Sequence, residues 1–409
     1  MSILGTLSTT RFIEQHWQKE PALIRQALAL PAALIDVDEL AGLACEDDVE
    51  ARLVQSDARQ LHWQCEDGPF DEARFAALPD SHWTLLVQGV DTHEPLIKAL
   101  LDHFAFLPRW RIDDIMLSYA VDGGGVGAHF DYYDVFLLQL QGKRRWQLGQ
   151  RCDGATPLRD DAPLKLLKEF HPRDEYVLEA GDMLYLPPGV AHCGTALGDD
   201  CVTASIGYRS PSPRALAERT LETLAANLSV NPGYRDTAAA IDTDPFRINP
   251  AAMSLVHAMG ETIVEAIGGK RGSARPSTAI CRAFGAQVTE SRHPDLVQAD
   301  EPIDQSTLDA HIDDLIRHAA PLTLEHHRAS RFAYADDYGD GPGDGQHSDR
   351  HDSGCLLFVD GETHCTSVAM ARGICHGSVS VGDLRTATKH DTDRQLLLRL
   401  INQGSLIAL

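Results

Sequence analysis

Hydrophobic positions between residues 115 and 208 occur in short runs that are separated by Gly, Pro and Asp. Turn signals such as Gly181-Asp182 and Pro187-Pro188-Gly189 stand between the runs. Several short strands at this close spacing are typical of a small barrel or jelly roll. The predicted strands are Ile115–Val121, Phe136–Gln141, Arg144–Leu148, Tyr176–Leu178, Met183–Leu186, His192–Leu197 and Val202–Tyr208.

The first hundred residues have a mixed α/β pattern. A helix that starts at a Thr10 cap carries Phe12, Ile13 and Trp17 and ends before Pro21. A second, acidic helix is expected around Leu40. The apolar run from Trp83 to Val90 predicts a strand, and a helix from about Glu94 to Phe104 follows it.

The strands stop after Pro211 and Pro213, and strong helix formers take over. Helices are predicted at Arg214–Leu228 and Asn249–Ile267. Apolar helical stripes beside a barrel build either a helical subdomain or a dimer interface, and we favour the interface.

The last third of the chain predicts a small module of helices and short strands. A helix at Ser306–His318 is followed by a second at Leu322–Ala329, and a polar insertion spans Tyr334–Gly354. The remaining elements are strands at Cys355–Val359 and Ser378–Val381 and a helix at Asp391–Asn402. Helices followed by a two-stranded wing predict a winged-helix-like domain. The expected domains are therefore 1–210, 211–278 and 279–409.

Charge changes the range of partners that the chain is expected to have. The 409 residues include 60 acidic and 36 basic side chains, for a net charge of −24. Such a surface repels nucleic-acid phosphates and attracts cationic partners, so DNA binding is disfavoured and a basic protein substrate is favoured. No apolar run is long enough to span a membrane and no export signal opens the chain, which predicts a cytoplasmic protein. Nine cysteines without a CxxC pair indicate reduced thiols.

The strongest chemical signal is His129-Phe130-Asp131, which follows the glycine-rich segment Gly123–Gly127. Side chains two residues apart on an extended segment project from the same face. If His192 reaches the same point, two imidazoles and one carboxylate form the facial triad of non-haem Fe(II) oxygenases. The alternative is a hydrogen-bonded surface Asp131 with two unrelated histidines.

Three motifs resemble the JmjC/cupin family of 2-oxoglutarate oxygenases. They are His129-Phe130-Asp131-Tyr132-Tyr133-Asp134-Val135-Phe136, Gly142-Lys143-Arg144-Arg145-Trp146, and the run from Gly181 to His192. They are most similar to the bacterial ribosomal oxygenases, which hydroxylate an arginine of a large-subunit ribosomal protein. The resemblance implies an α+β protein: a double-stranded β-helix (jelly roll), then a helical dimerisation region and a winged-helix-like carboxy-terminal domain.

The resemblance also implies roles for individual residues. His129, Asp131 and His192 match the Fe(II) ligands, and 2-oxoglutarate and O2 would take the remaining coordination positions. Arg144 matches the cation that binds the far carboxylate of 2-oxoglutarate, with Arg145 as its rival because strand alternation places only one of them inside. Ser118 is a plausible hydroxyl donor to that carboxylate, or equally a filler in a strand.

A guanidinium substrate requires an acid or aromatic faces. Asp122, before the glycines, and Tyr133 or Tyr132, after the ligands, are the candidates. Each has a structural alternative, because Asp122 is also a good turn residue and the tyrosines suit a core or a rim.

The expected activity is hydroxylation of carbon 3 of an arginine side chain in a 50S ribosomal protein, by a homodimer. The alternatives within the enzyme class are hydroxylation of a ribosomal histidine, lysine demethylation, and a cupin isomerase or dioxygenase without a cosubstrate. From another class, a non-enzymatic cupin binding module would keep the fold alone.

Overall fold

The structure is a computed structural model of the 409-residue chain. It describes residues 2–30, 34–57, 59, 61–227, 278–299, 301–336, 355–387 and 391–408, with a few isolated residues between 228 and 277. The chain divides into two compact units, Met1–Ser210 and Pro211–Leu409, and each is described separately. The further boundary expected at residue 278 stays a prediction.

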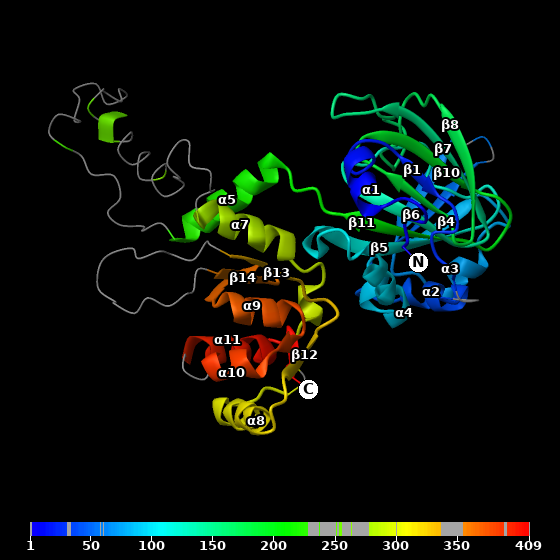
Figure 1. The fold of residues 1–409 in the computed structure, drawn as a ribbon. Helices are drawn as coiled ribbons and strands as arrows, with labels where there is room; N and C mark the ends of the chain where they lie inside the picture. The colour runs from blue at the N-terminus through cyan, green and yellow to red at the C-terminus, as the bar shows by residue number, and fades with distance from the viewer. Residues whose placement is uncertain are drawn as a thin grey trace. The chain divides into compact units, whose positions relative to one another are not determined.

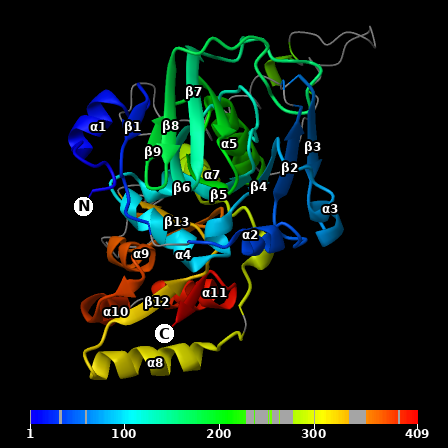
Figure 2. The same ribbon diagram turned by 90° about the vertical axis from the view of Figure 1, so that its right-hand side faces the viewer.

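Two antiparallel sheets build the amino-terminal unit (Figure 1). The larger sheet has the strand order β1-β9-β6-β11-β5-β4-β2-β3, and the smaller one has the order β10-β7-β8. Figure 2 shows β7 and β8 of the smaller sheet side by side, and β2 and β3 at the far edge of the larger one. The strands are β1 (Ala22–Ile24), β2 (Ala51–Ser56), β3 (Trp63–Asp67), β4 (Trp83–Val87), β5 (Ile112–Ala120), β6 (Asp134–Gln141), β7 (Lys143–Arg151), β8 (Asp174–Glu179), β9 (Met183–Leu186), β10 (Val190–Ala196) and β11 (Cys201–Tyr208).

Alternation along β6 separates the two faces of the larger sheet. Phe136 and Leu138 pack into the main core, which the amino-terminal elements cover. Leu137 points to the other side and packs with Trp146 and Leu148 of β7. The space between the two sheets is therefore the interior of a jelly roll, as predicted, and the strand alternation decides which side chains enter it.

Short helices precede and follow the early strands. They are α1 (Thr9–Gln15), α2 (Val37–Leu43), α3 (Glu72–Ala76) and α4 (Pro95–Lys98), and the last continues as a 3-10 helix over Ala99–Phe104. The predicted cap of the first helix is wrong, because the Ser8 hydroxyl, not Thr10, accepts the hydrogen bond from the Arg11 N–H. The strands β2 and β3 were not predicted at all.

The carboxy-terminal unit contains two three-stranded sheets, with orders β16-β12-β17 and β13-β14-β15. Gly285 lets α7 lie directly on one of them, since a Cβ there would stand 2.2 Å from the Phe358 ring. The elements are α5 (Pro213–Asn227), α7 (Thr278–Thr289), α8 (Gln305–Arg317), β12 (Leu322–His326), β13 (Phe332–Ala335), β14 (Cys355–Val359), β15 (Glu362–Thr366), α9 (Val368–Cys375), β16 (Ser378–Val379), α10 (Val381–Ala387), α11 (Asp391–Asn402) and β17 (Leu406–Ala408).

The helix predicted at Leu322–Ala329 is wrong, because the segment begins with strand β12. Leu322 and Leu324 are buried while Thr323 and Glu325 are exposed, which is the two-residue period of a strand. The predicted helix Asn249–Ile267 and most of the insertion Tyr334–Gly354 lie outside the described residues.

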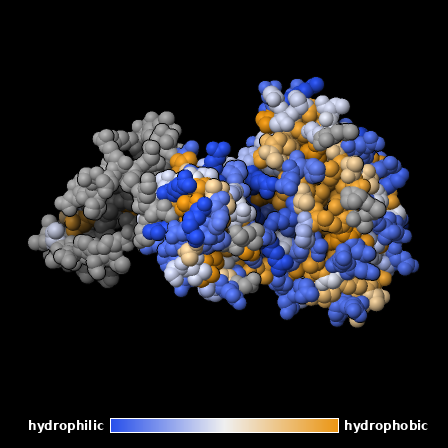
Figure 3. All heavy atoms as spheres, turned by 60° about the horizontal axis from the view of Figure 1, so that its bottom comes forward, coloured by the Kyte–Doolittle hydropathy of each residue, from blue (hydrophilic) through white to orange (hydrophobic). Residues whose placement is uncertain are grey.

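Within the described residues, no helix is long and apolar enough to cross a membrane. In Figure 3 apolar residues reach the surface of the amino-terminal unit in patches among polar ones.

Candidate active site

The glycine-rich segment lies along the free edge of β10 and brings His129 to His192. The Gly123 N–H donates to the Ala196 carbonyl at 3.1 Å, and the Ala196 N–H donates to the Gly124 carbonyl at 2.8 Å. Further along, His129 and His192 exchange both backbone hydrogen bonds, at 3.0 and 2.8 Å. The segment therefore acts as a short additional strand, and it ends with two histidines directly opposite each other.

Two of the glycines are required by close contacts with neighbouring backbone. A Cβ at Gly124 would lie 2.2 Å from the Trp83 carbonyl oxygen, and one at Gly125 would lie 2.2 Å from the Gly194 carbonyl oxygen. A side chain at Gly125 would push the segment away from β10, and one at Gly124 would push it away from the start of β4.

The side chains of His129, Asp131 and His192 converge, and their candidate ligand atoms all lie within 4.8 Å of one another. One carboxylate oxygen of Asp131 is 3.9 Å from Nε2 of His129 and 3.6 Å from Nε2 of His192. The Gly189 N–H donates to the Asp131 carbonyl at 2.8 Å, which fixes the chain between the two histidines. This is the only such cluster of potential ligands among the described residues.

Hydrogen bonds at the other ring nitrogen define the tautomer of each histidine. Nδ1 of His129 contacts the Gly127 carbonyl and Nδ1 of His192 contacts the Val190 carbonyl, both at 2.9 Å. A carbonyl only accepts, so each Nδ1 carries the proton and each Nε2 presents a lone pair toward Asp131. Burial and the nearby His129 lower the pKa of His192 to about 4, so its ring is neutral at pH 7. Two nitrogen donors and one carboxylate fit a divalent metal with three open positions.

Arg144 is the cation of the interior. It lies on β7 opposite Ala196, with only 4% of its surface exposed. Its Nε donates to the Cys201 thiol at 3.4 Å, while its buried Nη2 has no hydrogen-bond partner among the described residues. No described carboxylate forms an ion pair with it. A buried guanidinium without a counter-charge is costly unless an anionic ligand completes the site.

Strand alternation separates Arg144 from its rival. Arg144, Trp146 and Leu148 are buried, and Arg145 and Gln147 between them are partly exposed. Because Leu148 pairs with His192 and Arg144 pairs with Ala196, Arg144 and His192 face the same side of the smaller sheet.

Ser118 also lies on the inner face, opposite Thr203 of β11, with a long 3.4 Å hydrogen bond from its hydroxyl to the Thr203 carbonyl. Two neighbours that the sequence did not single out make this face polar. The Thr203 hydroxyl donates to the Gln139 side chain at 2.9 Å, and the Gln139 amide contacts the Cys201 thiol at 3.4 Å. In the sequence, Thr203 and Gln139 can be recognised only as polar residues within otherwise apolar predicted strands.

The structure does not bring Asp122 to the triad. Its carboxylate accepts the Gly198 N–H at 2.7 Å, in the connection between β10 and β11. That position is at the Ala196 end of the glycine-rich segment, whereas His129 is at the opposite end. The geometry matches the alternative of a turn residue.

Tyr133 lies beside the triad. Burial of its hydroxyl, with the carboxylates of Asp131, Asp114 and Asp113 nearby, raises its pKa well above the usual value, so it remains neutral. Tyr133 as a residue is still 43% exposed, and Tyr132 is 63% exposed. The Tyr132 ring makes an edge contact with Phe130, with 5.1 Å between the ring centres. Both tyrosines are thus available at the rim rather than in the core.

A buried polar network that the sequence did not reveal anchors the strand after the ligands. Asp134 is fully buried and accepts hydrogen bonds from the Tyr185 hydroxyl at 2.6 Å and from Arg111 at 3.0 Å. The Gln18 backbone N–H donates to the Tyr185 hydroxyl at 2.7 Å. The network ties the segment after α1 to the start of β6, three residues beyond Asp131.

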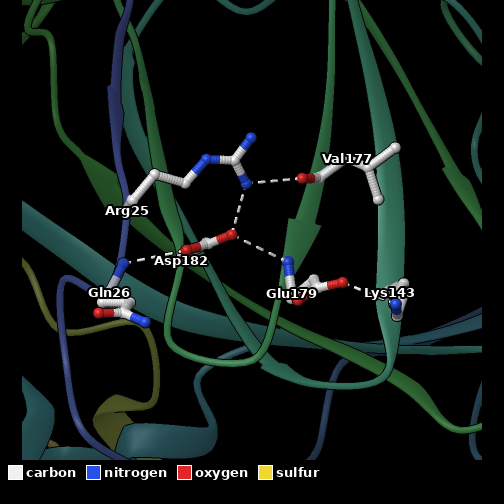
Figure 4. A network of polar contacts seen from close by, with 6 residues as sticks. All are labelled: Arg25, Gln26, Lys143, Val177, Glu179 and Asp182. Atoms are coloured by element: carbon white, nitrogen blue, oxygen red, sulfur yellow. Dashed lines mark hydrogen bonds and ion pairs between the residues drawn. The ribbon is translucent and has the colours of Figure 1, made fainter.

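A second network joins β1 to the turn between β8 and β9 (Figure 4). The Asp182 carboxylate accepts hydrogen bonds from the Arg25 guanidinium at 2.6 Å, from the Gln26 N–H at 2.9 Å and from the Glu179 N–H at 3.1 Å. Arg25 also donates to the Val177 carbonyl. Burial raises the pKa of Asp182, but these hydrogen bonds outweigh it and leave the pKa below its ordinary value.

Residues 99–216, which include the triad, match the family described as "JmjC domain". Nearly all of the matched segment lies within the amino-terminal unit, and it contains all three members of the triad. The chain is 41% identical over 215 residues to the ribosomal protein uL16 3-hydroxylase of Escherichia coli, which is 52% of this chain and 55% of that protein. It is 39% identical over 203 residues to the probable ribosomal oxygenase of Haemophilus influenzae, 49% of each chain. The aligned sequence spans about half the length of these curated relatives.

Solved structures resemble the chain over nearly its full length. The E. coli ribosomal oxygenase YcfD in complex with cobalt and 2-oxoglutarate is 27% identical, with a TM-score of 0.72 and 98% of both chains covered. A further E. coli YcfD structure gives a TM-score of 0.75 with 99% of both chains covered. The predicted resemblance to the bacterial ribosomal oxygenases is confirmed.

Proposed function

We propose that the protein is an Fe(II)- and 2-oxoglutarate-dependent protein hydroxylase whose substrate is an arginine side chain of a basic large-subunit ribosomal protein. The observation that carries the proposal is the convergence of two Nε2 lone pairs and one carboxylate on the same barrel interior that contains an uncompensated arginine. The named relatives support the same reaction class, because one is a 3-hydroxylase and another was solved with 2-oxoglutarate.

His129, Asp131 and His192 would hold the iron. When bound, the metal and 2-oxoglutarate supply the oxidation of an unactivated C–H bond by O2. The protein contributes position: the backbone bridge between the histidines fixes the donor atoms, and the carbonyls of Gly127 and Val190 fix the ring orientations.

Arg144 would bind the far carboxylate of 2-oxoglutarate through charge-assisted hydrogen bonds, with Ser118 as a neighbouring donor. The unpaired Nη2 supports this role. An isomerase or dioxygenase without a cosubstrate would not require a buried cation on the face that carries His192.

Two features support a basic protein as the substrate: the negative charge of the chain and the tyrosines beside the triad. A net charge of −24 attracts a basic ribosomal protein. Tyr133, beside Asp131, offers a neutral hydroxyl and an aromatic face to a guanidinium, and hydroxylation at carbon 3 follows from the resemblance. Asp122 could contact a substrate only by giving up the hydrogen bond that it accepts from the Gly198 N–H. We therefore assign the contact with the substrate guanidinium to Tyr133 rather than to Asp122.

The cosubstrate reaction is tested by measuring succinate formed from 2-oxoglutarate with Fe(II), for wild type and for His129→Ala. We expect turnover in the wild type and none in the variant. Equal turnover in both proteins would remove the triad from the mechanism, and metal binding without turnover would favour a non-enzymatic cupin module.

The substrate is tested by mass spectrometry of ribosomal proteins from a deletion strain. We expect one large-subunit protein to lose about 16 Da, one oxygen atom, at an arginine. The same loss at a histidine would instead identify a ribosomal histidine hydroxylase.

We also propose that the protein is a homodimer in which residues 211–278 form a helical dimerisation region. Residues 279–409 would form a winged-helix-like domain. The protein would act on ribosomal protein in the cytoplasm. Gel filtration at micromolar concentration tests the dimer, since a monomer would contradict it.

A further inference from the structure

Trp146 carries an unsatisfied donor on the same face of β7 as Arg144. The indole is buried, with 5% of the residue exposed, and its Nε1–H has no hydrogen-bond partner among the described residues. Buried indole N–H groups normally have a hydrogen-bond acceptor, because a buried donor without one loses its hydration and gains nothing in return. An orphan donor in an interior that also contains an orphan guanidinium requires an explanation.

Trp146 lies between Arg144, which would bind the far carboxylate of 2-oxoglutarate, and the metal ligand His192. Along β7, Arg144, Trp146 and Leu148 face the same side, opposite Ala196, Gly194 and His192 in turn. The Arg144 guanidinium carbon lies 5.8 Å from the centre of the Trp146 ring, and the His192 ring lies 5.8 Å from it as well. Trp146 is therefore level with the space between the metal-binding end and the cationic end of the interior.

Gly194 supports a fixed place for this ring. A Cβ at position 194 would lie 2.7 Å from the six-membered ring of Trp146, so glycine at this position lets the indole approach the β10 backbone closely. An indole held in this way has little freedom to turn its N–H toward another acceptor.

We propose that Trp146 is a positioning residue whose indole N–H donates a hydrogen bond to a carboxylate oxygen of the 2-oxoglutarate cosubstrate. The inference rests on the proposed function for the identity of the ligand. The far carboxylate of 2-oxoglutarate has two oxygens and several lone pairs, so one carboxylate can accept from both Arg144 Nη2 and Trp146 Nε1. With the carboxylate held at two points, its keto acid end is directed at the triad.

The test uses the full chain loaded with Zn(II), a diamagnetic substitute for iron, and 15N-labelled at its five tryptophans. The indole signal that disappears in Trp146→Phe belongs to Trp146. On addition of 2-oxoglutarate to the wild type, we expect this proton to shift downfield. Trp146→Phe keeps the aromatic packing, and we expect it to bind 2-oxoglutarate at least about 10-fold more weakly, the factor expected for the loss of one hydrogen bond to a charged acceptor.

Trp83→Phe is the matched control, because the Trp83 indole donates to the Pro79 carbonyl near the surface. We expect it to bind 2-oxoglutarate as the wild type does, and all three proteins to bind Zn(II) with equal affinity. An unmoved Trp146 signal together with wild-type affinity in Trp146→Phe would overturn the proposal. If Trp146→Phe does not fold, Trp→Phe variants of the other four tryptophans assign their signals and leave that of Trp146, and its shift in the wild type then decides. A wild type that binds Zn(II) but no 2-oxoglutarate would instead defeat the proposed function, and this ligand with it.

Discussion

The carboxylate of Asp134 accepts the hydroxyl of Tyr185 at 2.6 Å, at a site where neither side chain is exposed to solvent. The contact joins the start of β6 to β9, close to the ligand Asp131. It also links the catalytic strands to the amino-terminal lead-in, since Gln18 donates to the same hydroxyl.

Tyr185→Phe should lower the free energy of unfolding by about 1–3 kcal/mol, because it leaves one carboxylate oxygen of buried Asp134 without its donor. Chemical denaturation measures the change. Tyr132→Phe, at a 63% exposed ring, is the control and should leave stability within about 0.5 kcal/mol of wild type. Equal stability of both variants would show that the buried contact contributes nothing.

Arg144→Met should retain the metal but weaken 2-oxoglutarate binding at least about 30-fold, because truncating one partner of a buried charged pair costs about 2 kcal/mol or more. Calorimetric titration with and without Zn(II) separates the two steps. Arg145→Met is the matched control on the opposite face of β7, and its affinity should be unchanged. The reverse order of the two variants would reassign the cosubstrate cation to Arg145.

Gly125→Ala should lower stability by about 1–3 kcal/mol, because its Cβ would collide with the Gly194 carbonyl. The displaced segment carries His129, so metal affinity should fall about 10-fold. Gly42→Ala in α2 meets nothing within 4 Å and should be neutral or slightly stabilising. Wild-type metal affinity in Gly125→Ala would mean that the ligand segment does not depend on its contact with β10.

Asp182→Asn should destabilise the protein by about 1–2 kcal/mol at pH 7, in a pH-dependent manner. The folded-state pKa of Asp182 is lowered, so its stabilisation is complete above the unfolded value of about 3.9 and disappears as pH falls through the folded value. Unfolding curves between pH 7 and 3 should therefore show a constant difference from wild type down to about pH 5 and a shrinking one below about pH 4. A difference that grows toward low pH would contradict this sign.

The jelly roll was predictable because short apolar strands alternate with turns that contain Gly, Pro and Asp. The structure contains all seven predicted strands, with bounds that differ from the predicted ones by a few residues. The strands β2 and β3 were missed because charged and amide side chains such as Arg52, Gln64 and Glu66 interrupt their apolar pattern. The wrong helix at Leu322 arose from Pro321, which also fits a helix start, while the two-residue period of Leu322 and Leu324 was overlooked.

The triad could be predicted because residue types and spacing identify it, whereas its surroundings depend on partners distant in the sequence. The turn role of Asp122 depends on Gly198, and the orphan state of Trp146 depends on which strands face each other. No local pattern reveals either of them.

The paired main chains of His129 and His192 have one more consequence. Because each histidine fixes the other through two hydrogen bonds, the spacing of the nitrogen donors is established when the barrel folds, before any ion arrives. Metal capture then orders few additional bonds, so the apo protein is preorganised for its ion. Ions whose preferred geometry departs from this preset spacing must strain the barrel wall or bind more weakly.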